Sequence, residues 1–148
     1  MNAYVPRYSL PSPGVSSRAS TSDATVTMPT ANWPAVPWIV FASSVVARIG
    51  VANHEAIAAA KGGVEALARS AAATYASLSL RINVVAPGMT DTPMTAGMLK
   101  VPAMREGAGK QYPLGGVQSA DSVAAAMAWL LSDAASRITG QVIPVDGG

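Results

Sequence analysis

Hydrophobic residues follow a regular pattern only from Pro37 onward. The first short apolar run is continuous, as expected of a strand buried on both faces of a sheet. With the two similar runs after it, the pattern predicts three strands, at residues 38–42, 81–86 and 141–145. Long helical stretches separate them, at residues 54–76 and about 119–132. Strands that alternate with helices predict parallel pairing through right-handed crossovers.

Turn and cap residues mark the ends of these elements. The pair Pro87-Gly88 stops the second strand, and Ser119 and Asp121 indicate a helix start because their side-chain oxygens can accept the free amides of a first turn. Between these signals, residues 95–112 show no clear period, and we expect an irregular segment with one short helix there.

The first 36 residues differ from the rest of the chain. Prolines recur among many serines and threonines, without a helical or an alternating period. Such a stretch buries too little apolar surface to offset its ordering entropy. We therefore expect residues 1–36 to be a low-complexity, disordered segment and residues 37–148 to form the folded domain.

Composition excludes several classes of function. The chain has 148 residues, enough for one domain, and a net charge of +2 with scattered Lys and Arg, so we expect no nucleic-acid partner. It has no cysteine, which excludes disulfide scaffolds and zinc ribbons and fits a reducing cytoplasm. We also expect no metal site and no membrane segment, because the most apolar window is short and is interrupted by Ser43, Ser44 and Arg48.

Several segments carry specific motifs. Ser44 follows the first strand, and Lys61 lies on the next helix within Ala-Ala-Ala-Lys-Gly-Gly-Val. Residues 83–88 read Asn-Val-Val-Ala-Pro-Gly. In order and spacing these segments resemble the short-chain dehydrogenase/reductase (SDR) family, and residues 83–88 are similar to its strand leading to the nicotinamide site. Residues 138–148 are similar to its last strand. The resemblance implies an α/β fold, the last three strands and helices of a Rossmann-like, doubly wound parallel sheet.

The resemblance also implies catalytic roles. In the family a tyrosine exchanges a proton with the substrate oxygen, a serine polarises the carbonyl, and a lysine favours the tyrosinate and binds the nicotinamide ribose. Ser44 matches the serine, with Ser43 as the alternative register, and Lys61 matches the lysine of Tyr-x-x-x-Lys. Ile57 occupies the tyrosine position. We interpret Ile57 as a core residue, since its side chain cannot transfer a proton.

His54 is a candidate to replace the missing proton donor. It is the only histidine, its unperturbed pKa near 6.5 suits proton transfer, and it lies three residues before Ile57 on the predicted helix. The alternative is a solvated or capping residue at the helix start. Tyr112 lies in the segment that often covers substrates in the family, although no spacing supports a role for it.

The loop after the second strand is the remaining candidate. By resemblance, four of its residues contact the nicotinamide carboxamide: Pro87, Gly88, Thr90 and Thr92. The alternative is a plain strand-terminating turn.

The resemblance implies NAD or NADP as cofactor, yet the sequence contains no Thr-Gly-x-x-x-Gly-x-Gly turn to bind the pyrophosphate. We therefore expect a truncated, inactive SDR-like protein without tight cofactor binding of its own. The alternative is a catalytically silent remnant or an interaction module that forms homo-oligomers through the helix at 54–76 and the last strand.

Overall fold

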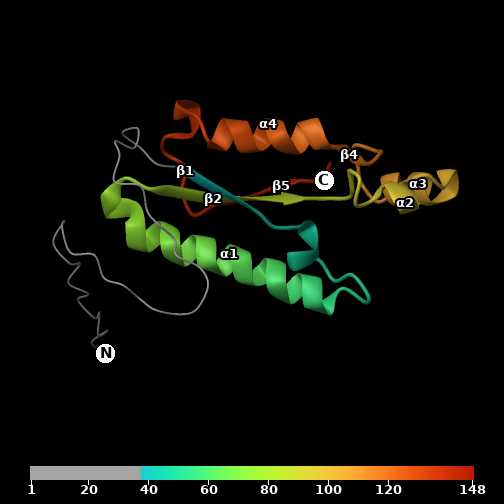
Figure 1. Ribbon diagram of the computed structural model, residues 1–148, viewed down its shortest axis with the longest axis horizontal. Coiled ribbons are helices and arrows are strands. Elements are labelled where there is room, and N and C mark those ends of the chain that lie inside the picture. The colour runs from blue at the N-terminus through green and yellow to red at the C-terminus, as the bar shows by residue number, and fades with distance from the viewer. Residues whose placement is uncertain (1–37) are drawn as a thin grey trace, which may run out of the picture. The chain divides into compact units, whose positions relative to one another are not determined.

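The computed structural model describes residues 38–148, and Figure 1 shows their arrangement. The expected disordered segment at residues 1–36 lies outside the described residues. Within the described part the chain forms an α/β unit in which a parallel sheet lies between two long helices. The predicted fold class is therefore confirmed, with a partial sheet.

The main sheet has three parallel strands in the order β1-β2-β5. Their bounds are Trp38–Ala42, Arg81–Pro87 and Val142–Val145, each within one residue of the prediction. The central strand β2 is buried along residues 81–86, while β1 and β5 are partly exposed. This difference follows from position, because within residues 38–148 each outer strand has a hydrogen-bonded neighbour on one side only.

Each long helix covers one face of the sheet (Figure 1). Helix α1 (Glu55–Tyr75) packs Ala68 and Ala72 against Ile82 and Val84 of β2. Helix α4 (Ala120–Leu130) packs on the opposite face, where Leu130 joins a second cluster of buried side chains with Val85 and Ala135. Ile82 and Val84 face α1 while Val85 faces the other side, because successive side chains of a strand point to opposite faces of the sheet.

Shorter elements connect the sheet and the helices. The remaining 3-10 helices, helices and strands are η1 (Val45–Ala47), η2 (Ala76–Leu78), β3 (Thr90–Asp91), α2 (Ala96–Leu99), α3 (Pro102–Gly109), β4 (Gln118–Ser119) and η3 (Asp133–Ala135). Strands β3 and β4 pair in parallel as a separate small sheet. None of the helices within residues 38–148 is both long enough and apolar enough to cross a membrane.

Two predicted helix features have different outcomes. Ser119 is the N-cap of α4, and its hydroxyl accepts the Ser122 amide at 3.1 Å, as predicted. The segment 95–112 holds two short helices where we expected one. Pro102 explains the division, because proline favours the first turn of a new helix and cannot donate a backbone hydrogen bond within a continuing one.

Candidate active site

The amino end of α1 lies at the carboxyl end of β1, and this junction brings the predicted serine and lysine to one region. The Lys61 ammonium donates to the carbonyl of Ala42, the last residue of β1, at 3.0 Å. Ser44 follows two residues later as the N-cap of η1, and its hydroxyl accepts the Val46 amide at 3.3 Å. Both side chains are half-buried. The side-chain roles that the resemblance implies for Ser44 and Lys61 stay predictions.

The alternative serine has a different environment. Ser43 is buried, and its hydroxyl donates to the Glu65 carboxylate at 2.9 Å and approaches the Lys61 carbonyl at 3.3 Å. Its amide donates to the Val85 carbonyl of β2 at 2.8 Å. Because these contacts hold Ser43 inside the protein, Ser44 is the serine better placed to meet a ligand.

Glu65 is a buried carboxylate that the sequence reasoning missed. Its side chain is 5% exposed and accepts hydrogen bonds from Ser43 and from Arg48 Nε, the latter at 3.1 Å. Arg69 lies farther away, at 3.7 Å. Glu65 lies one turn after Lys61 on the helix. The sequence signal that could have revealed it is therefore an acidic residue on the side of α1 that faces the sheet. It ties α1 to the segment that carries Ser44.

The interpretation of Ile57 as a core residue is wrong. Its side chain is 48% exposed, although it lies one turn before the half-buried Lys61. The buried positions of α1 lie only farther along the helix, at Glu65, Ala68 and Ala72. The amino end of α1 therefore extends beyond the packed part of the sheet, and residues 38–148 leave Ile57 uncovered.

His54 lies at the N-cap position of α1 without capping an amide through its side chain. Its Nδ1 lies 2.8 Å from the Ala52 carbonyl oxygen. Since a carbonyl can only accept, Nδ1 carries the proton in this contact, and Nε2 of the neutral ring is left as an acceptor. The capping alternative thus lacks its hydrogen bond, while the catalytic role of His54 stays a prediction.

The loop after β2 is fixed by its own hydroxyl groups. The Thr95 hydroxyl donates to the Thr90 carbonyl at 2.6 Å and accepts the Thr92 amide at 3.0 Å. The Thr90 hydroxyl donates to the Gly88 carbonyl at 2.9 Å. Pro87 ends β2. Each residue that the resemblance assigns to this loop therefore belongs to one ordered turn. Thr95, which bonds to Thr90 and Thr92, was missed because it lies outside the matched motif itself.

Gly88 is required by close packing. Its amide donates to the Val145 carbonyl of β5, and a Cβ added at this position would lie 3.0 Å from Asp146 Cβ. Tyr112 also lies against Gly88, and its phenol oxygen accepts the Met89 amide at 2.7 Å. Tyr112 therefore supports the loop, a role that sequence spacing did not reveal.

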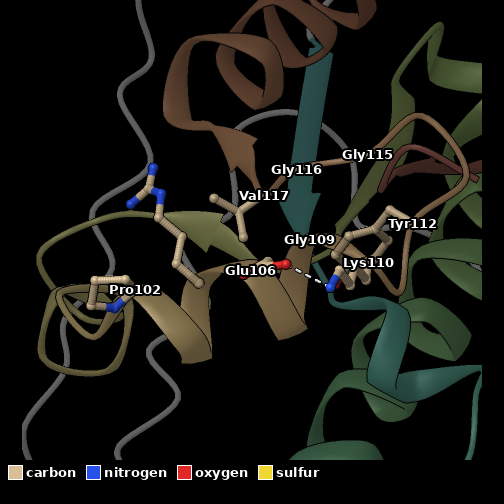
Figure 2. Close-up of a pocket in the computed structure, with 9 residues that line it drawn as sticks. Pro102, Glu106, Gly109, Lys110, Tyr112, Gly115, Gly116 and Val117 are labelled. Atoms are coloured by element: carbon tan, nitrogen blue, oxygen red, sulfur yellow. Dashed lines mark ion pairs between the residues drawn. The ribbon is translucent and has the colours of Figure 1, made fainter.

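A cavity of about 580 Å³ lies beside this loop, between α3 and the chain leading to β4 (Figure 2). Figure 2 shows Lys110 directed toward Glu106, and their ion pair measures 2.6 Å. The cavity is lined by Pro102, Arg105, Glu106, Gly109, Lys110, Tyr112, Gly115, Gly116 and Val117. Of the residues weighed from sequence only Tyr112 lines it, so the cavity is separate from the Ser44 and Lys61 region.

The site contains only part of what a dinucleotide requires. The family resemblance assigns Lys61 and the turn at residues 87–92 to the nicotinamide end, and the Thr90 and Thr92 hydroxyls are bonded within the turn. The sequence holds no glycine-rich turn for the pyrophosphate. Within residues 38–148, no group of three or more His, Cys, Asp or Glu side chains could hold a metal ion. The residues present thus do not fit a complete NAD(P).

Comparison with known proteins gives matches to dehydrogenases and reductases. A family model described as enoyl-(acyl carrier protein) reductase matches residues 15–148. Cis-4-hydroxycyclohexanecarboxylate dehydrogenase from Sinomonas cyclohexanicum is 46% identical over 111 residues, which are 74% of this chain and 43% of that protein. The chain thus spans less than half the length of this relative.

Solved structures with a similar fold come from the same kinds of enzyme. A short-chain type dehydrogenase/reductase from Mycobacterium ulcerans superimposes with a TM-score of 0.73 at 32% identity, covering 77% of this chain and 42% of that one. The angucycline C-6 ketoreductase LanV, solved with bound NADP, gives a TM-score of 0.72 at 29% identity and covers 78% of this chain and 44% of its own. The family model, the relative and the folds show that the chain belongs to the short-chain dehydrogenase/reductase family.

Proposed function

We propose that the chain is an oxidoreductase-like SDR protein that does not catalyse hydride transfer by itself. The observation that carries the proposal is Ile57, an exposed hydrocarbon at the position where the family's reaction needs a proton donor. Lys61 has no phenol one turn away to influence, and its ammonium is bonded to the Ala42 carbonyl. General acid catalysis contributes roughly 10²- to 10⁴-fold in typical enzymes, so its loss alone would largely silence the site.

The cofactor part of the proposal concerns NAD or NADP. LanV with its bound NADP supports this cofactor class for the family. In this chain, we propose that the nicotinamide end of the site is represented by Lys61, Pro87, Gly88, Thr90 and Thr92, while tight binding is lost with the pyrophosphate turn. The reaction class would be the interconversion of alcohols and carbonyls. The lack of cysteine supports a reducing cytoplasm as its location.

Turnover assays of the purified chain and of Ile57→Tyr test this proposal. Both proteins are mixed with secondary alcohols and NAD(P), or with ketones and NAD(P)H, while nicotinamide absorbance is followed. We expect no turnover from either protein, because a restored phenol cannot act on a cofactor that does not bind. Turnover by the unaltered chain would contradict the proposal. Turnover by Ile57→Tyr alone would show that cofactor binding survives and that only the proton donor is missing.

A second candidate function is self-association through α1 and the last strand. Two apolar side chains of α1, Leu67 and Ile57, are exposed together with Tyr75 at its end. Pairing of this helix with a second copy would cover these side chains. Sedimentation measurements should find a dimer or larger species that Leu67→Glu dissociates, whereas Glu55→Gln, a change at the exposed start of the same helix, should leave it intact. A monomer at all concentrations would contradict this function.

A further inference from the structure

A second hollow lies at the opposite end of the sheet from the predicted active site. Its volume is about 410 Å³, and its walls come from η2, the turn after it and the start of β2 on one side and the segment after η3 on the other. The lining residues are Ala76, Ser79, Leu80, Arg81, Ser136, Arg137 and Thr139. Strand β2 has seven residues between this hollow and the Pro87 turn, which separates the two sites by roughly 20 Å.

Arg81 is a buried cation in the wall of this hollow. It is 6% exposed, and its guanidinium donates to the carbonyls of Ile138 at 3.2 Å and Ser132 at 3.0 Å. The guanidinium carbon lies 5.2 Å from the centre of the Trp38 ring. Its Nε–H has no hydrogen-bond partner among residues 38–148. Arginine stays charged in proteins, so this side chain keeps a full positive charge in a poorly solvated place.

No carboxylate compensates that charge within the described residues. Their ion pairs involve other basic groups, and neither Arg81 nor Arg137 takes part in one. None of the hollow's lining residues is acidic. Asp133, the acid nearest to Arg137 along the chain, lies in η3 and does not line the hollow. Two positive charges therefore face one polar hollow, and burying a cation without an anionic partner is costly.

Hydroxyl groups complete the wall. The Thr139 hydroxyl accepts the Ile82 amide at 3.1 Å, so its own proton is available to donate toward a ligand. Ser79 and Ser136 line the same hollow. Guanidinium groups and hydroxyls together match the several oxygens of a tetrahedral oxyanion, for which arginine is especially suited.

We propose that this hollow binds a phosphate group, either as inorganic phosphate or as part of a small phosphomonoester. Arg137 contacts the anion, and the Thr139 hydroxyl donates to it. Arg81 acts through its delocalised charge from the wall, because its Nε is itself covered. The volume exceeds that of a bare phosphate ion, which leaves room for the organic part of a monoester. The site is independent of the Ser44 and Lys61 region and of any dehydrogenase activity.

Titrations followed by backbone amide NMR test this proposal on the full chain. Inorganic phosphate, glycerol phosphate and acetate are added separately at constant ionic strength set with sodium chloride. We expect saturable shifts of the Ser79, Arg137 and Thr139 amides with both phosphates and not with acetate. A tighter monoester would identify the organic phosphate as the preferred source, and a tighter inorganic phosphate the free ion.

Matched variants separate a built site from general charge attraction. Arg137→Gln should weaken phosphate binding about tenfold, while Arg105→Gln, which removes the same charge from the exposed pair with Asp91, should change it less than twofold. Arg81→Lys keeps the charge and tests the guanidinium without requiring a buried neutral side chain. Linear shifts without saturation, or equal weakening by Arg137→Gln and Arg105→Gln, would mean an adventitious ion only and would overturn the proposal.

Discussion

Removing the Glu65 carboxylate should destabilise the protein more than removing any exposed acid. Glu65→Ala deletes two hydrogen bonds to a charged group, from Ser43 at 2.9 Å and from Arg48 at 3.1 Å, in a side chain that is 5% exposed. Each such bond contributes about 1.5–3 kcal/mol in typical proteins. The junction between β1, η1 and α1 depends on these contacts.

Four effects make the expected loss smaller than the sum of these two contributions. The Ser43 hydroxyl can turn to the Lys61 carbonyl, already 3.3 Å away, and the Arg48 side chain, which is 44% exposed, can turn to water. Alanine also removes the cost of burying a carboxylate and has a better helix propensity than glutamate. The expected net loss in the free energy of unfolding is about 2 kcal/mol. With an m-value of about 1.5 kcal/mol/M, the urea midpoint should fall by about 1.3 M.

Urea unfolding followed by circular dichroism measures this loss. Glu106→Ala is the matched control, because its pair with Lys110 is shorter, at 2.6 Å, but Glu106 is 67% exposed. An exposed pair of this kind contributes about 0.5 kcal/mol or less. Glu65→Gln should fall between the two, since it keeps an acceptor for Ser43 without the charge. Midpoints of Glu65→Ala and Glu106→Ala that agree within error would refute the role given to burial.

Two further predictions concern the loop after β2. Gly88→Ala should lower the free energy of unfolding by about 1–3 kcal/mol in urea, because its Cβ would lie 3.0 Å from Asp146 Cβ. The control Gly97→Ala meets nothing within 4 Å and should be neutral or stabilising. Equal effects of the two substitutions would contradict the close packing at Gly88. Tyr112→Phe should lower the free energy of unfolding by about 1 kcal/mol, because it leaves the Met89 amide without its partner at 2.7 Å. Hydrogen exchange at that amide should become faster. Unchanged exchange would show that the hydrogen bond is not formed.

The sequence predicted the main elements well because their signals are local. The apolar run at Trp38–Ala42 and the Pro87-Gly88 stop correspond to the strand ends observed. Ser119 caps α4 for the same local reason, since its hydroxyl needs only an amide three residues away. At these positions an amino-acid preference acting over a few residues was sufficient, and the prediction and the structure agree.

The site was less predictable because its contacts join distant residues. Glu65 meets Ser43 across 22 positions, and Tyr112 meets Met89 across 23, separations at which no periodicity operates. Ile57 was assigned to the core from its chemistry alone, yet burial depends on what covers the amino end of α1. Arg81 was treated as part of a buried strand, and its unpaired charge became visible only with its surroundings.

The central proposal is that this chain, which has a partial SDR fold, lacks a working cofactor site. Fluorescence titration of the purified chain with NADH and NADPH tests it most directly, because binding precedes every later step of the family's reaction. The account predicts a signal that rises in proportion to cofactor without saturation for both dinucleotides. Saturable binding in the micromolar range would contradict it, since Lys61 and the turn at residues 87–92 would then suffice without a pyrophosphate turn.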